Sequence, residues 1–155
     1  MLFRSGAKPV QRPHPPIYFS GLKDPKRSAR RIAKYGLAGW IGIQDTPEEI
    51  VRWRGAIQRE LEELGSSRSL DDGFDMCSMI WFAITDSPTD QTNNGKLSNL
   101  LVGTAEQITD NLKRYRDAGM DMPLLWPPFS GVPVAKTLDD LKRLVGDIMP
   151  KVNGT

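Results

Sequence analysis

Four short apolar segments, each followed by an amphipathic one, most restrict the fold of this 155-residue chain. The apolar segments are Ile17–Gly21, Gly39–Ile43, Met76–Thr85 and Met122–Trp126. Short β-prone runs bounded by glycine, proline or polar residues are typical of buried strands. Strand-helix units that follow one another require parallel strands with right-handed crossovers and helices that cover the sheet. The sequence therefore predicts an α/β fold.

The amphipathic segments carry signals for the ends of helices. Pro25 suits the first position of the first helix. Thr46–Glu49 and Thr104–Gln107 are capping boxes, in which two side chains bond reciprocally to backbone N–H groups at a helix start. Thr137–Asp140 resembles a third cap, and we expect the last helix to end before Pro150 because proline cannot continue a helix. The polar tract Asp86–Lys96 is expected to be loop.

The pattern of the third strand, Met76–Thr85, differs from the others. It contains Ile80, Trp81, Phe82 and Ile84 without clean alternation of apolar and polar residues. Such a run is typical of a strand covered on both faces, and that is the prediction here.

Composition narrows the classes of partner. Lysine and arginine number 21 against 19 acidic residues, for a net charge of +2, so we expect no nucleic-acid partner. The longest apolar runs are far below the ~20 residues that a membrane span needs, and no apolar signal core begins the chain, so we expect no membrane partner. The single cysteine, Cys77, forms no internal disulfide and favours a reducing compartment. We therefore predict one domain and a cytoplasmic location.

Several residues whose side chains could take part in catalysis or bind a metal are predicted to have only structural or solvent-exposed roles. His14, the only histidine, precedes the first strand and so lies at the amino end of the sheet, opposite the expected ligand site. Asp71, Asp72 and Asp75 do not have the spacing of a calcium loop. Cys77 is expected in the core because no histidine is placed to activate it. The sequence predicts no metal site and identifies no catalytic residue.

Ligands of parallel α/β sheets bind at the carboxyl ends of the strands. The loops to search are therefore 20–24, 44–46, 86–104 and 127–137. Trp126 and Phe129 flank the exit of the fourth strand. They could line a substrate pocket or pack between strand and helix.

Several segments together resemble a known family. They are KPVQRPHPPIYFSG (8–21), SARRIAKYGLAGWIG (28–42), TPEEI (46–50) and LVGTAEQITDNLKRYRDAGMD (101–121). In this order they are similar to the carboxyl-terminal half of luciferase-like flavin- or deazaflavin-dependent monooxygenases. The resemblance implies strands five to eight of a TIM (β/α)8 barrel, with FMN or coenzyme F-420 as cofactor and a small organic molecule as substrate. Where the family has an aspartate before GW, Ala38 stands two residues before Trp40, which weakens any polar role there.

The resemblance also implies a cofactor site at the end of the first strand. Ser20 and Gly21 occupy the positions that contact the cofactor's phosphate or ribityl end, and Leu22 and Lys23 extend the same corner. Glycine lets backbone approach a ligand, and N–H groups before a helix attract anions. A tight turn that needs small residues explains the same pair without any ligand.

Half a barrel has two unpaired sheet edges and an exposed interior. We therefore expect a homo-oligomer or a complementary N-terminal half-barrel as partner, and an isolated chain that is inactive. The chain is predicted as one partial domain with a proline-rich lead-in (1–16), βα units (17–150) and a tail (151–155). The alternative is a truncated, noncatalytic α/β binding or interaction module.

Overall fold

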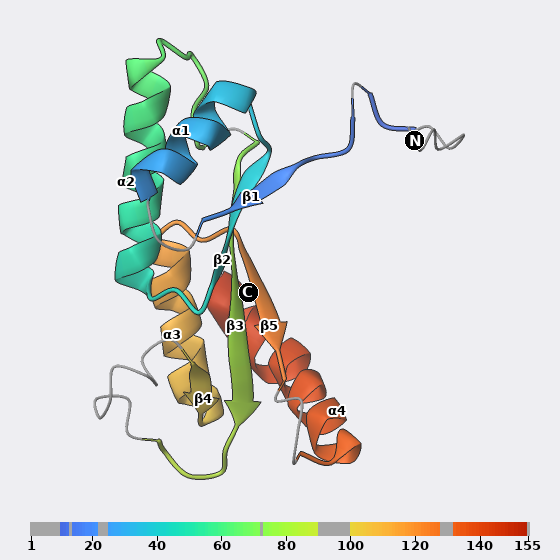
Figure 1. Ribbon diagram of the computed structural model, residues 1–155. Coiled ribbons are helices and arrows are strands. Elements are labelled where there is room, and N and C mark those ends of the chain that lie inside the picture. The colour runs from blue at the N-terminus through green and yellow to red at the C-terminus, as the bar shows by residue number, and fades with distance from the viewer. Residues whose placement is uncertain are drawn as a thin grey trace.

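The computed structural model describes residues 10–12, 14–21, 25–71, 73–89, 100–127 and 132–154. Strands and helices alternate along these residues (Figure 1). In chain order the elements are β1 (Tyr18–Ser20), α1 (Pro25–Tyr35), β2 (Gly39–Ile43), α2 (Pro47–Glu63), β3 (Asp75–Ile84), β4 (Leu101–Gly103), α3 (Ala105–Asp117), β5 (Met122–Trp126), α4 (Val134–Arg143), the π-helical turn η1 (Leu144–Ile148) and α5 (Met149–Asn153).

All paired strands of the sheet run parallel, as predicted. β1 pairs with β2, and β2 pairs with residues 75–79 of β3. β5 pairs with residues 77–81 of β3, so β3 lies between β2 and β5. The parallel α/β prediction is confirmed, and the carboxyl ends of the strands point to one end of the sheet.

Strand β4 was not predicted. It has three residues and pairs with residues 82–84 of β3, beyond the part of β3 that β2 contacts. A segment of three residues is too short to show periodicity. Leu101 and Gly103 are nevertheless buried, and Thr85 N donates to Gly103 O at 2.8 Å, which extends the pairing past the end of β3.

The two predicted capping boxes are confirmed. Thr46 Oγ1 accepts from the N–H of Glu49, whose Oε2 accepts from the N–H of Thr46. Thr104 and Gln107 make the same pair of bonds at the start of α3. Both boxes follow directly on a sheet strand or its loop, so they fix where the chain turns back from the sheet.

The predicted limits of the last helix are wrong at both ends. α4 begins at Val134 with Pro133 at the N-cap position, and the N–H of Thr137 already donates to Pro133 O at 3.2 Å. Thr137 is therefore inside the helix. At the other end the helix continues through η1 into α5 as far as Asn153, with Pro150 in the first turn of α5. A wider π turn accommodates a residue without an N–H, which explains how Pro150 fits and why residues 151–153 are helical.

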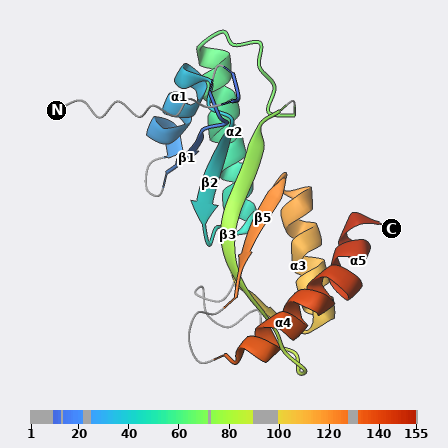
Figure 2. The ribbon, with the colours of Figure 1, turned by 90° about the vertical axis from the view of Figure 1, so that its right-hand side faces the viewer.

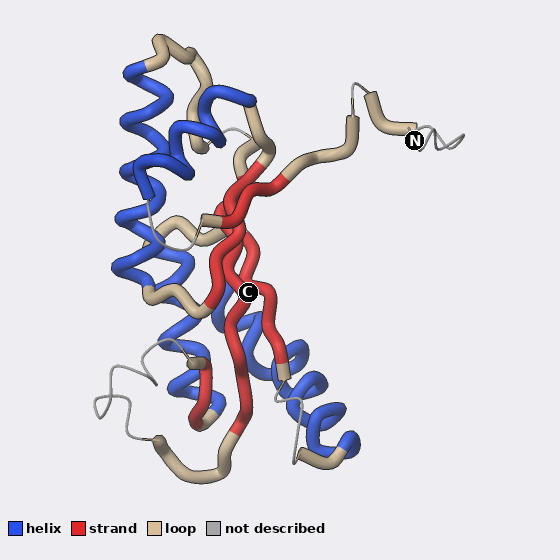
Figure 3. The backbone as a smooth tube through the Cα atoms, in the orientation of Figure 1, coloured by secondary structure: helices blue, strands red, loops and turns tan. Residues whose placement is uncertain are grey.

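One face of the sheet forms the core with the helices. Side chains that alternate along β2 and β3 toward the helices are almost fully buried: Trp40, Met76, Ile80, Phe82 and Ile84. The indole rings of Trp40 and Trp53 lie 4.9 Å apart between centroids, which joins β2 to α2. α1, α2 and α3 lie together on this side (Figures 1 and 3), and the C-terminal helical segment adds Leu144, Ile148 and Val152 to the same core.

The opposite face of the sheet is not covered by the helices of the described chain. Pleating and register place on it Tyr18, Ser20, Ile41, Ile43, Asp75, Cys77, Met79, Trp81, Ala83, Met122, Leu124 and Trp126, which we call the open face. Large side chains remain accessible there, with Trp81 41% and Trp126 43% exposed. The prediction that β3 is covered on both faces is therefore wrong: its lack of alternation reflects two apolar faces, of which only one is packed.

Candidate functional site

The carboxyl ends of the parallel strands form a staggered rim. Ser20 ends β1, Gln44 follows β2 and Trp126 ends β5, while β3 extends beyond its pairing with β2 and β5 to Ile84. Figure 2, which turns the sheet toward the viewer, shows these strands side by side with α4 beside the lower end of β5 and β3. The rim adjoins the open face, so a ligand at the rim can contact apolar side chains of the sheet.

Ser20 and Gly21 differ in their surroundings. Ser20 is exposed, on the open face at the carboxyl end of β1. Gly21 lies against the helices: a Cβ atom there would be 2.2 Å from Ser28 Oγ and 3.0 Å from Trp53 Cη2. Close packing of α1 and α2 on the strand end thus accounts for the glycine. Of the predicted corner, Leu22 and Lys23 lie outside the described residues.

A tryptophan pair lies on the open face near the rim. Trp81 of β3 and Trp126 of β5 are register partners, so their side chains leave the sheet on the same side from adjacent strands. Both keep more than a third of their surface accessible. Trp126 was predicted as a pocket residue, whereas Trp81 was missed because its partner becomes known only from the strand order. Phe129 lies outside the described residues.

An apolar groove runs beside this pair. Its volume is about 460 Å³, and its lining residues are Met79, Pro123, Leu124, Leu125 and Trp126. Four of the five are aliphatic or imino side chains and the fifth is an indole, so the groove favours an apolar or flat aromatic ligand.

A partly buried carboxyl group, that of Asp45, fixes the turn after β2. The Ser78 hydroxyl donates to Asp45 Oδ2 at 3.0 Å, and the Tyr115 hydroxyl donates to Asp45 O at 2.8 Å. Gln44 has a left-handed φ of 56°, and its N–H donates to Met79 O at 2.8 Å. Burial raises the pKa of Asp45 to about 6, and the nearby Glu49 carboxylate acts in the same direction. Asp45 therefore can hold a proton up to about pH 6, but it bonds to Ser78 on the helix side of the sheet.

The other titratable groups lie away from the rim or have separate partners. The exposed His14 precedes β1, as predicted. Cys77 is buried, and desolvation raises the pKa of its thiol to about 11, which agrees with a core role. The Tyr18 hydroxyl donates to Asp75, and Asp71 pairs with Arg54. Asp72 lies outside the described residues.

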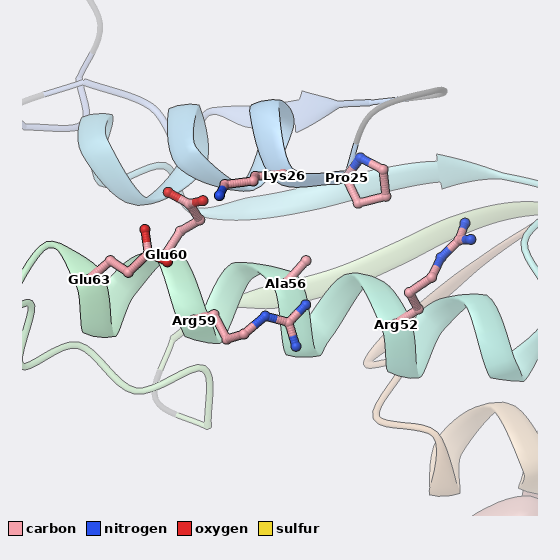
Figure 4. Close-up of a pocket in the computed structure, with 7 residues that line it drawn as sticks. All are labelled: Pro25, Lys26, Arg52, Ala56, Arg59, Glu60 and Glu63. Carbon is pink, nitrogen blue, oxygen red and sulfur yellow. The ribbon is translucent and has the colours of Figure 1, made fainter.

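A second cavity lies between α1 and α2 on the outer side of the molecule (Figure 4). It has a volume of about 320 Å³ and is lined by Pro25, Lys26, Arg52, Ala56, Arg59, Glu60 and Glu63. Within the described part of the chain, Glu60 Oε2 is buried without a hydrogen-bond partner. Figure 4 shows Lys26 and Glu60 extending toward each other across the helix pair. This cavity contains none of the rim residues.

Solved structures share this arrangement. An F420-dependent secondary alcohol dehydrogenase in complex with an F420-acetone adduct aligns with a TM-score of 0.61 at 16% identity, over 88% of this chain and 48% of its own. Monooxygenase RslO1 from Streptomyces bottropensis aligns with a TM-score of 0.67 at 17% identity, over 90% of this chain and 49% of its own. The chain has the fold of half a luciferase-like barrel.

A third luciferase-like structure agrees. It is the oxygenating constituent of 3,6-diketocamphane monooxygenase from Pseudomonas putida, in complex with FMN, with a TM-score of 0.63 at 14% identity over 89% of this chain and 49% of that chain. The luciferase-like half-barrel thus spans about half the length of each of these chains. No protein-family model and no curated protein matches the sequence. In the described residues no helix is long and apolar enough to cross a membrane.

Proposed function

We propose that this chain is the carboxyl-terminal segment of a luciferase-like oxidoreductase that binds FMN or coenzyme F-420 and oxidises a small organic substrate. The observation that carries the proposal is the exposed Ser20 at the same rim as the open apolar face, in a fold shared with enzymes of both cofactor types. Catalysis requires the rest of the barrel, because the described chain covers only one side of such a ligand.

The rim residues fit the two ends of such a cofactor differently. Ser20 presents an exposed hydroxyl at a strand end, where it would donate to a phosphate oxygen. Leu22 and Lys23 remain part of this proposed corner. The exposed indoles of Trp81 and Trp126 and the apolar groove beside them suit a flat conjugated ring.

The protein's contribution is binding, orientation and exclusion of water. The bound cofactor would supply the redox chemistry, which is hydride exchange with the substrate or, for FMN, activation of oxygen. The acid of the described open face, Asp75, lies at the amino end of β3 and accepts from the Tyr18 hydroxyl, whereas the side chains near Trp81 and Trp126 are apolar. Proton transfer would therefore depend on groups of the remaining half-barrel or on the substrate itself.

The test is a fluorescence titration of the purified chain with FMN and with coenzyme F-420. We expect saturable binding of one of them, and we expect Ser20→Glu to weaken it about tenfold or more by placing a carboxylate against the phosphate. Ser67→Glu is the matched control, because Ser67 is exposed in the loop between α2 and β3, at the opposite end of the sheet. Absence of binding, or equal loss in both variants, would favour the noncatalytic module instead.

A further inference from the structure

Apart from the three-residue strand β4, the sheet leaves two outer edges unpaired within the described chain. β1 pairs only with β2, and β5 pairs only with β3. Strand edges next to an accessible apolar face are sites of association, because a strand of another chain can pair with the edge while its side chains cover the face. Any occupant must therefore satisfy both edges and cover the open face.

We propose that a second copy of this chain closes the sheet into an eight-stranded parallel barrel. A two-fold axis along the barrel would place β5 of each copy beside β1 of the other. The same rotation would therefore pair the free edge of β1 and the free edge of β5 in both copies. Each copy contributes four strands to the barrel: β1, β2, β3 and β5. The solved chains that share this fold are about twice as long as the part that aligns with this chain. This inference rests on the fold and not on the cofactor, and the second copy then supplies the rest of the barrel that catalysis requires.

The register predicts which residues meet. Ser20 is in register with Ile41, Cys77 and Met122 across the sheet. A barrel of this type has a shear of about eight residues around eight strands, hence about four for each half. Four residues after Met122, toward the carboxyl end of β5, is Trp126. Four residues before Met122 lies outside β5, so that direction is excluded. Ser20 of one copy therefore lies beside Trp126 of the other, at the shared rim.

The available apolar area is consistent with a stable pair. The helical segment that follows β5 adds exposed apolar side chains spaced three and four residues apart: Val134, Leu138, Leu141 and Val145. Trp81 and Trp126 alone expose roughly 200 Å² together, if each offers about 250 Å² in full. With Ile43, Met122 and the stripe the total approaches the ~800 Å² per partner of a specific interface.

Cysteine cross-linking tests the geometry. In the double variant Ser20→Cys, Trp126→Cys, we expect oxidation to give a disulfide-linked dimer, because each new thiol meets its counterpart in the other copy. Within one chain the two positions are separated by β2 and β3, about 14 Å of strand spacing, which no disulfide spans. Ser20→Cys, Met122→Cys is the matched control: position 122 lies about 13 Å further along β5, so we expect little cross-linking. The native Cys77 is in register with Met122, so both variants also carry Cys77→Ser, which excludes a disulfide within one chain.

Sedimentation of the unmodified chain supplies the second measurement. We expect a species of twice 17.3 kDa at micromolar concentration. A monomer, a dimer linked through Ser20→Cys on both copies, or assembly only with a separate N-terminal half-barrel would each overturn the proposal. Cross-linking without any cofactor binding would leave it standing while contradicting the proposed function.

Discussion

Ser78, in the middle of β3, holds Asp45 at the end of β2 through a 3.0 Å hydrogen bond from its hydroxyl to Asp45 Oδ2. Space for this contact depends on Gly42, where a Cβ atom would lie 1.9 Å from the same oxygen. The bond links two adjacent strands at the rim and positions the strained Gln44 between them. The turn after β2 is thus fixed by side-chain chemistry from the helix side of the sheet.

The raised pKa of Asp45 predicts a dependence of stability on pH. The folded state retains the proton up to about pH 6, whereas the unfolded carboxyl loses it near 3.8. The unfolded state therefore binds fewer protons in this window, and the free energy of unfolding falls as pH rises from about 4 to about 6. Asp45→Asn should abolish this slope and stabilise the protein at pH 7 by on the order of 1–2 kcal/mol, after allowance for solvent screening. Urea denaturation at about pH 4 and about pH 6 measures this change in the free energy of unfolding, with the exposed Asp117→Asn as control. If Asp45→Asn kept the same slope as the wild type, the assignment to Asp45 would be contradicted.

Glycine positions offer a pair of substitutions with opposite effects. Gly21→Ala should lower the free energy of unfolding by about 1–3 kcal/mol, because its new Cβ meets Ser28 and Trp53. Gly55→Ala, within α2, meets only Arg59 Nη1 at 3.7 Å and should stabilise by about 0.5–1 kcal/mol through helix propensity. Thermal and chemical denaturation compare the two. Equal effects would show that Gly21 is not packed as described.

Two threonines test the helix starts. Thr46→Ala removes the cap of α2 and should cost about 0.5–2 kcal/mol of stability. Thr137→Ala should cost nothing or stabilise slightly, because Thr137 lies inside α4 and alanine is the better helix former. A comparable loss of stability in both variants would instead support the helix cap that the sequence predicted at Thr137.

The four tryptophans form two classes that quenching separates. Trp40 and Trp53 are buried and stacked in the core, while Trp81 and Trp126 are accessible on the open face. At protein concentrations low enough for monomers, acrylamide should quench Trp81 and Trp126 and leave the other two largely protected. Single Trp→Phe variants assign the signals, and uniform quenching of all four would contradict the one-sided core.

The sequence allowed prediction of those features that local patterns encode. The capping boxes of α2 and α3 and the limits of β2 and β5 follow from residues within one turn or strand, so they were confirmed. β4 and the limits of the C-terminal helix depend on contacts with distant residues. Burial of Leu101 beside β3 and the π turn before Pro150 have no local signature.

The candidate site could be anticipated only in part for the same reason. Parallel strands predicted the rim, and Ser20 does lie there. Trp81 reaches the site only through its register with Trp126, and Asp45 through its bond to Ser78 from another strand. Gly21, by contrast, was predicted to contact a ligand. In the structure its lack of a side chain is explained by close packing against Ser28 of α1 and Trp53 of α2.

The most direct test of the account is the dissociation constant of FMN and of coenzyme F-420 for the wild-type chain and for Trp81→Leu and Trp126→Leu. Stacking on the open face predicts that one cofactor binds saturably and that each substitution raises its dissociation constant about tenfold. Val51→Ala, an exposed position on α2 on the helix side of the sheet, serves as control and should leave that constant unchanged. Failure of both cofactors to bind, or affinities unaffected by loss of either tryptophan, would contradict the claim that the rim and open face form a cofactor site.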